Sequence, residues 1–227
     1  MASRVVLLTG AAGGLGEVTA EAFAKAGATL ILSSRNEEKL NEIAASLPGG
    51  PHEVLAADLD VHGAAQELIA RAGEIDILVA NAGRPGGWAL DDTEADEITS
   101  VIRVNFEVPI QMAKAVIPQM KERGSGQIVF IASLAGKFAL PDSTMYSSTK
   151  SRGVASIGRP IAIARRGKLA CTFVTHGISD PLMLSKTTAG KRRSFSRRQR
   201  AAVASKEGAG SLLSRVTSTG ECAFRKW

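Results

Sequence analysis

The stretch RVVLLTGAAGGLGEVTAEAFAKAG, residues 4–27, decides the fold. It begins with the apolar run Arg4–Thr9, which is typical of a strand buried on both faces of a parallel sheet. Glycines follow, and from Glu17 to Ala26 apolar residues recur at helical spacing until Gly27 stops the pattern. The stretch therefore predicts a strand, a glycine-rich turn and a helix, which together form the first unit of an α/β fold.

The same alternation continues along the chain. Strands are predicted over residues 29–33, 52–57, 75–80, 127–132 and 169–175. Helices are predicted over residues 36–46 and 63–71, over residues 95–105 and on to 123, and from about Tyr146 onward. Because strands and helices alternate, the strands should lie parallel, with helices on both faces of the sheet. We predict an α/β fold of the Rossmann type, a doubly wound parallel sheet in a single domain.

Charge divides the chain of 227 residues into two parts. Residues 1–185 hold 17 Lys and Arg against 20 Asp and Glu, whereas residues 186–227 hold 11 against 2. The first part is long enough to bury a substantial core, and we expect it to be the dinucleotide-binding catalytic domain. The second part has little apolar sequence, and we expect an atypical, basic and mobile carboxyl-terminal segment.

Composition also restricts the partners. The first 185 residues are slightly acidic and carry no basic stripe, so we expect no nucleic acid; binding to nucleic acid or to an anionic membrane would depend on the basic segment alone. The uncharged run Val5–Gly16 is too short and too rich in glycine to span a bilayer, and no cleavable targeting signal follows it. Cys171 and Cys222 are expected to be reduced thiols in a cytoplasmic protein, and we assign no metal site.

The glycine-rich turn, TGAAGGLG at residues 9–16, lies where the predicted first strand passes into a helix. Glycines there allow backbone to approach a phosphate at the amino end of the helix, although tight turns also need glycine for steric reasons alone. Ser34 and Arg35 close the second strand, where a carboxylate would bind the ribose hydroxyls of NAD. No carboxylate is present, and Arg35 is either an ordinary surface arginine or a bidentate donor to the 2′-phosphate of NADP. We expect NADP(H) rather than NAD(H).

Tyr146 and Lys150, in YSSTK, are four residues apart and so lie on one face of a helix. A free tyrosine titrates at a pH of about 10, and a neighbouring ammonium lowers the pKa of a phenol toward the range useful for acid–base chemistry. Such pairs also occur as ordinary neighbours on helix surfaces. However, Tyr146 is the only tyrosine of the chain, and Ser133 lies thirteen residues before it, directly after a predicted strand.

Together these motifs resemble those of the short-chain dehydrogenase/reductase family. The resemblance rests on the spacing T-G-x-x-x-G-x-G in the glycine turn and on YSSTK with the preceding serine. It implies an NAD(P)-dependent oxidoreductase that transfers a hydride between the cofactor and a small carbonyl or alcohol substrate. The catalytic residues that it implies are Asn105, Ser133, Tyr146 and Lys150.

Each of these residues has a role in the resemblance. Ser133 and Tyr146 would bind the reacting oxygen, and Tyr146 would supply the proton. Lys150 would lower the pKa of Tyr146 and hold the nicotinamide ribose, while Asn105 would hold a water in the proton relay. Asp58 would accept a hydrogen bond from adenine, and the turn at residues 81–83 would lie against the cofactor and tie neighbouring strands. The cofactor-binding residues that we expect are Gly10, Gly14, Leu15, Gly16, Ser34, Arg35, Asp58, Leu59, Asn81, Ala82, Gly83, Tyr146 and Lys150.

The sequence departs from the family pattern after Lys150. Pro160 interrupts the helix that often forms the family's dimer interface, at a cost of about 3 kcal/mol, so we expect a break near Arg159, which puts a homo-oligomer in doubt. The usual Pro-Gly turn after the strand at residues 169–175 is replaced by residues 176–180, in which His176 is expected to be a loop residue and Ser179 a nicotinamide contact.

The segment that usually shapes the substrate pocket in the family cannot be read from this sequence. From Lys186 onward the last strand of the family sheet is not recognisable, as would follow from a change of reading frame. A small hydrophobic or lipid-like carbonyl substrate is indicated only by Trp88, Phe138, Leu140 and Met183. The alternative function is a catalytically impaired, cofactor-binding or regulatory protein.

Overall fold

The computed structural model describes residues 4–86, 90–136, 143–157 and 168–176, and for residues 152–157 and 168–176 the backbone alone. Six strands form one sheet in the order β3-β2-β1-β4-β5-β6, and every neighbouring pair is parallel. The strands are β1 (Val5–Thr9), β2 (Thr29–Ser33), β3 (Glu53–Val54), β4 (Ile77–Ala80), β5 (Ser125–Ser133) and β6 (Lys168–His176). The strand order changes direction between β1 and β4, which confirms the predicted Rossmann-type fold.

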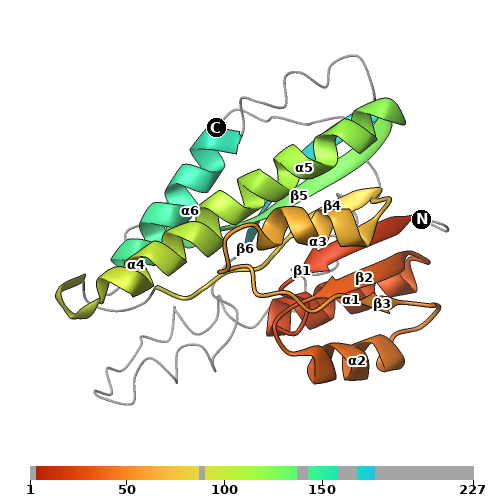
Figure 1. Cartoon of the computed structure of the whole chain (residues 1–227), viewed down its shortest axis with the longest axis horizontal. Coiled ribbons are helices and arrows are strands. Elements are labelled where there is room, and N and C mark those ends of the chain that lie inside the picture. The colour runs from red at the N-terminus through yellow and green to blue at the C-terminus, as the bar shows by residue number, and fades with distance from the viewer. Residues whose placement is uncertain (1–3, 87–89, 137–142, 158–167, 177–227) are drawn as a thin grey trace, which may run out of the picture.

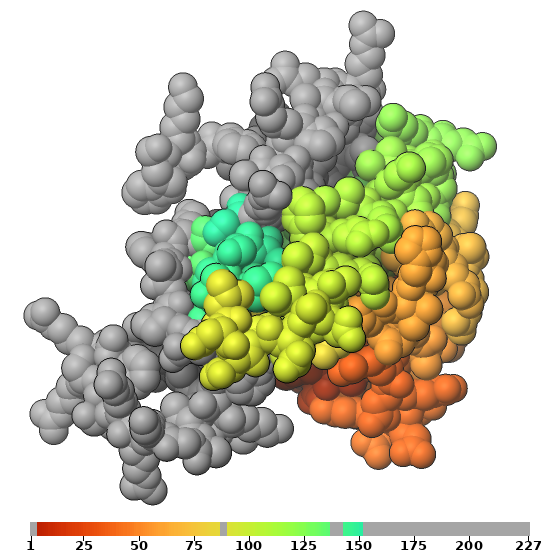
Figure 2. Space-filling model, turned by 60° about the vertical axis from the view of Figure 1, so that its left-hand side comes forward, coloured from red at the N-terminus to blue at the C-terminus, as the bar shows by residue number. Residues whose placement is uncertain are grey.

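Helices cover both faces of this sheet (Figure 1). On one face lie α1 (Gly14–Lys25) and α2 (Glu37–Ser46), and on the other α3 (Ala64–Ala72) and α5 (Val108–Glu122). Helices α4 (Ala95–Ile102) and α6 (Thr144–Ile157) pack against each other on the α5 side, as the yellow and teal surfaces of Figure 2 show. Because α6 also contacts β5, the helix that carries YSSTK is fixed against the sheet.

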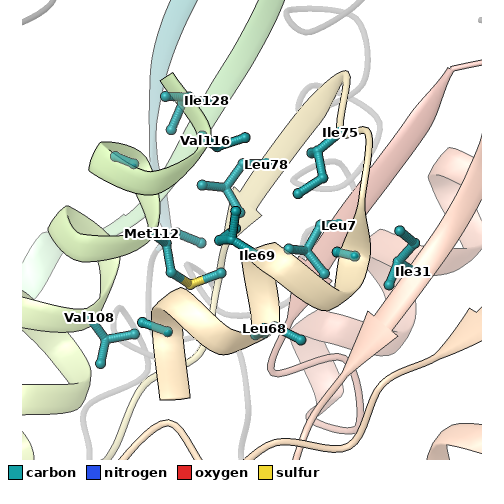
Figure 3. Packing of buried hydrophobic residues seen from close by; sticks show 14 of the residues in the cluster. Leu7, Ile31, Leu68, Ile69, Ile75, Leu78, Val108, Met112, Val116 and Ile128 are labelled. Atoms are coloured by element: carbon teal, nitrogen blue, oxygen red, sulfur yellow. The ribbon is translucent and has the colours of Figure 1, made fainter. Parts of the chain in front are cut away.

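Side chains that alternate along the strands build a separate core on each face. Leu7 and Leu78 point into a cluster with α3 and α5, in which Met112 is fully buried (Figure 3). Leu8 and Val79, the next residues along β1 and β4, belong instead to the cluster under α1 and α2. The period of two in a strand therefore explains why the predicted strands read as continuous apolar runs: both faces are buried.

Several boundaries differ from the predictions. Strand β3 pairs with β2 at only two residues, Glu53 and Val54, so it is shorter than the predicted range 52–57. The helices predicted over residues 95–105 and on to 123 are joined by a π-helical turn at Arg103–Glu107, after which α5 continues through Pro118. His176 is the last residue of β6, which corrects its expected place in a loop. The predicted break near Arg159 and the boundary near Ser185 lie outside the described residues.

In the described part of the chain, no helix is long and apolar enough to cross a membrane. No group of three or more His, Cys, Asp or Glu side chains in the same residues is arranged to hold a metal ion.

Candidate active site

The carboxyl ends of β1, β4 and β5 bring three predicted site segments to one edge of the sheet. The glycine turn follows β1, Asn81 follows β4 directly, and Ser133 is the last residue of β5. These strands are neighbours in the order β1-β4-β5, so segments separated by more than 40 residues in the sequence meet there. In an open parallel sheet this edge is the place where ligands bind.

The glycine turn is shaped for a close approach of backbone. Gly10 has a φ of +65°, which favours glycine, and a Cβ on it would lie 2.9 Å from the Cα of Ala82. A Cβ on Gly16 would collide with the carbonyl oxygen of Gly10 and lie 2.7 Å from the Cα of Ala11. Helix α1 begins directly after Gly13, and no side chain caps this end of the helix with a hydrogen bond. The first backbone N–H groups of α1 therefore suit an anionic ligand such as the pyrophosphate of a dinucleotide.

Asn81 ties this turn to β4. Its Nδ2 donates to the carbonyl oxygens of Thr9, at 2.9 Å, and Gly10, at 3.2 Å. The Oγ1 of Thr9 accepts hydrogen bonds from the backbone N–H groups of Asn81 and Ala82, both at 3.1 Å. The structure therefore has the tie between strands that the resemblance implies for residues 81–83. Sequence reasoning missed the role of Thr9 in this tie between strands. Its only signal is a buried hydroxyl directly before the first glycine.

The end of β2 holds polar groups that fit a phosphorylated ribose. The Oγ of Ser34 is buried and has no hydrogen-bond partner among the described residues, and Arg35 beside it is exposed. A buried hydroxyl without a partner is costly, and a ligand oxygen would satisfy it. Asp58 is exposed after β3, as an adenine contact requires, whereas the side chain of Leu59 is buried in the core and leaves only its main chain for the cofactor.

Tyr146 and Lys150 lie on α6 beside the end of β5. The side chain of Ser133 lies near enough to the phenol of Tyr146 to act on its pKa, and the Nζ of Lys150 lies 5.7 Å from the centre of the tyrosine ring. Lys150 is 9% exposed, and its Nζ donates to the carbonyl oxygen of Ile131 at 3.0 Å. The structure thus brings together the serine, the phenol and the ammonium that the sequence analysis selected.

Asn105 lies in the π-helical turn, on the other side of Gly83. Its Oδ1 accepts from the backbone N–H of Arg84 at 2.7 Å, and its Nδ2 donates to the carbonyl oxygen of Arg84 at 2.9 Å. A Cβ on Gly83 would lie 3.2 Å from this Oδ1 and 3.8 Å from the Nζ of Lys150. Gly83 therefore keeps space open between the amide and the ammonium. A π-turn is a frequent feature of functional sites. The helical pattern of the sequence carries no signal that would have predicted this one.

Burial controls the ionisation of the Tyr146–Lys150 pair. It raises the pKa of Tyr146, an effect that the nearby Ser133 side chain opposes. It lowers the pKa of Lys150 from 10.5 to about 8. The expected lowering of the Tyr146 pKa is therefore not found, because the loss of water around the phenol outweighs the favourable interactions of its charged form. A phenol that stays protonated at neutral pH is a proton donor.

Gly14 and Leu15 are two further residues predicted to bind the cofactor. They form the exposed and half-buried start of α1, as expected for a turn that faces a ligand. The residues on which the substrate and nicotinamide predictions depend are outside the described residues: Trp88, Phe138, Leu140, Ser179 and Met183.

Sequence reasoning also missed the buried Thr149. Its Oγ1 accepts a hydrogen bond from the Nδ2 of Asn105 at 3.3 Å and donates one to the carbonyl oxygen of Tyr146 at 2.9 Å.

A parallel sheet with a glycine turn after its central strand defines the class of protein, a dinucleotide-binding α/β protein. Comparison with known proteins narrows the class. The family model described as short chain dehydrogenase matches residues 4–187. A crystal structure of a metagenomic short-chain oxidoreductase in complex with NADP is similar at a TM-score of 0.69 and 30% identity, over 77% of this chain and 82% of that one.

Two relatives show how far the likeness in sequence extends. Dehydrogenase/reductase SDR family member 7B of Mus musculus is 36% identical over 64% of this chain, and this match spans 48% of the mouse protein. An uncharacterized oxidoreductase of Staphylococcus epidermidis is 30% identical over 84% of both chains. The chain thus spans about half the length of the first of these relatives. It belongs to the short chain dehydrogenase family, a family of NAD(P)-dependent oxidoreductases.

Proposed function

We propose that this chain transfers a hydride between NADP(H) and a small carbonyl or alcohol substrate. The observation that carries the proposal is the convergence of Ser133, Tyr146 and Lys150 at the end of β5, with Asn105 across Gly83. Ordinary neighbours on a helix surface would be exposed, whereas Lys150 is buried against the sheet.

The proposed reduction uses the protonated phenol. Tyr146 donates its proton to the substrate oxygen, and Ser133 hydrogen-bonds the same oxygen and holds it in place. The nicotinamide supplies the hydride when the cofactor is bound. Lys150, close to Gly83 and Asn105, then passes a proton back toward Tyr146, and a pKa of about 8 suits that exchange near neutral pH. The same groups act in reverse when an alcohol is oxidised.

The preference for NADP(H) is part of the proposal. It is supported by the unpartnered Oγ of Ser34 and by the exposed guanidinium of Arg35, which together offer donors to a 2′-phosphate. The metagenomic relative in complex with NADP is a further indication. We also propose a cytoplasmic location, which the low cysteine content favours.

The test is a fluorescence titration of the purified chain with NADPH and NADH, followed by turnover against a panel of aldehydes and ketones. We expect tighter binding of NADPH, and turnover that Tyr146→Phe reduces by at least about a thousandfold, since it removes the proton donor from an otherwise unchanged ring. Binding without turnover of any carbonyl would favour the alternative function, a catalytically impaired cofactor-binding protein. Absence of binding would contradict both.

A further inference from the structure

Asp60 is the centre of a set of polar contacts that the reaction itself does not explain. It follows β3, and its carboxylate receives hydrogen bonds from the Nη1 of Arg84 at 2.8 Å and of Arg103 at 3.3 Å, and from the Oγ of Ser100. Arg103 also donates to the Asp60 carbonyl oxygen at 2.7 Å. Only 23% of the Asp60 side chain is exposed, so these contacts are partly shielded from water.

The charge of Asp60 is favoured in this environment. Burial raises the pKa of its carboxyl, but the hydrogen bond from Ser100 and the guanidinium groups of Arg84 and Arg103 together hold the pKa below its usual value. Charge-assisted hydrogen bonds of this kind are stronger than neutral ones. Asp60 is therefore a firm anchor for α4, for the π-helical turn and for the segment after β4.

This anchor connects two parts of the candidate site. On one side, the backbone N–H of Asp60 donates to the Oδ1 of Asp58 at 3.0 Å, beside the proposed adenine contact. On the other side, Arg84 is held by Asp60 through its side chain and by Asn105 through both of its backbone groups. Since Arg103 begins the π-helical turn that contains Asn105, Asp60 holds this turn directly through Arg103 and indirectly through Arg84.

We propose that Asp60 is a positioning residue, which holds the π-helical turn and the segment at residues 81–86 so that the Asn105 amide stays oriented toward Gly83 and Lys150. This inference rests on the proposed function for the role of Asn105 in turnover. The position of the amide is a property of the chain itself and needs no substrate. Asp60 touches neither of the proposed proton donors, so its effect passes through Arg84 and Arg103.

Hydrogen exchange on the whole chain tests the positioning without turnover. In Asp60→Asn, which keeps the shape but removes the charge, amides of residues 81–86 and 101–107 should exchange about tenfold faster than in the unchanged protein. Ser100→Ala, which removes one contact, should give a smaller increase in the same segments. The matched control is Asp76→Ala, whose carboxylate receives the backbone N–H of Val5 at 2.9 Å, before β4. It should leave exchange in both segments unchanged.

Kinetics separate positioning from general destabilisation. Asp60→Asn should lower kcat about tenfold and change the Kd for NADPH less than threefold, and in an Asn105→Ala background it should cause no further loss of kcat. Unchanged exchange, or kcat losses that multiply in the double variant, would overturn the inference. If the unchanged protein shows no Tyr146-dependent turnover, the proposed function fails, and the exchange result alone then decides the role of Asp60.

Discussion

At the scale of single residues, Lys150 combines function with a cost in stability. Its folded pKa of about 8 lies below 10.5, so burial of the ammonium opposes folding by about 3 kcal/mol at neutral pH. The folded protein loses this proton first, and the contribution of Lys150 to the free energy of unfolding therefore rises between about pH 8 and pH 10.5. This sign follows because the unfolded chain binds more protons in that range.

Lys150→Met should therefore give a protein that is inactive but more stable. We expect the free energy of unfolding at pH 7 to rise by about 1–2 kcal/mol, a value that already subtracts the lost hydrogen bond to Ile131. Toward pH 10.5 the gain should disappear, because the unchanged protein then buries a neutral amine. Urea unfolding at both pH values measures the difference. Lys25→Met on exposed α1 is the control, expected to change stability by less than about 0.5 kcal/mol at pH 7.

In the proposed function, Arg35 decides the selectivity between NADPH and NADH. Arg35→Ser should raise the Kd for NADPH about 10- to 100-fold, because charge-assisted hydrogen bonds to the 2′-phosphate are lost, and should change the Kd for NADH less than twofold. Fluorescence titration with both cofactors gives the ratio. Lys25→Ser removes a cation from the exposed surface of α1 and should alter neither value. An equal loss for both cofactors would mean that Arg35 does not read the phosphate.

At the scale of elements, the glycine turn offers a matched pair of substitutions. Gly16→Ala forces a Cβ against Gly10 and Ala11 and should lower the free energy of unfolding by about 1–3 kcal/mol. Gly13→Ala meets only the carbonyl oxygen of Gly10, at 3.4 Å, and its φ of −89° suits alanine. We therefore expect a smaller loss, of about 0.5–1 kcal/mol, because alanine is a poorer helix N-cap than glycine. Thermal unfolding compares them, and equal effects would show that the turn relaxes around the added methyl group.

Elements with a regular pattern were predictable from the sequence, and irregular ones were not. The bounds of β2 match the prediction, since its apolar run is bounded by polar residues. The end of β3 depends on how far an edge strand pairs, and the π-helical turn adds one residue to a helix; neither leaves a periodic signal. Tyr146 and Lys150 could be found because their spacing is local, whereas Asp60 and Arg103 are 43 residues apart and meet only in the folded chain.

At the scale of the whole molecule, the two cores share the strands and should unfold together. Leu7→Ala and Leu8→Ala, one from each core, should each lower the free energy of unfolding by about 2–5 kcal/mol. Either variant should shift the same single thermal transition, because each core needs the sheet that the other one supports. Val18→Ala, at a position 44% exposed on α1, serves as the control. Two separate transitions would contradict this coupling.

The strand order also determines when, during biosynthesis, β1 gains the second of its neighbouring strands. Strand β1 lies between β2 and β4, but β4 begins 44 residues after β2 ends, so a ribosome needs roughly 2 to 9 seconds to add the missing neighbour. During that interval one edge of β1 has no partner from the sheet, a state in which a nascent strand is open to pairing with other chains. The glycine turn is likewise made well before Asn81, the residue that ties it in place. The synthesis of Asn81 therefore supplies the side chain that holds the glycine turn, and cells that translate this stretch quickly would shorten the exposed period.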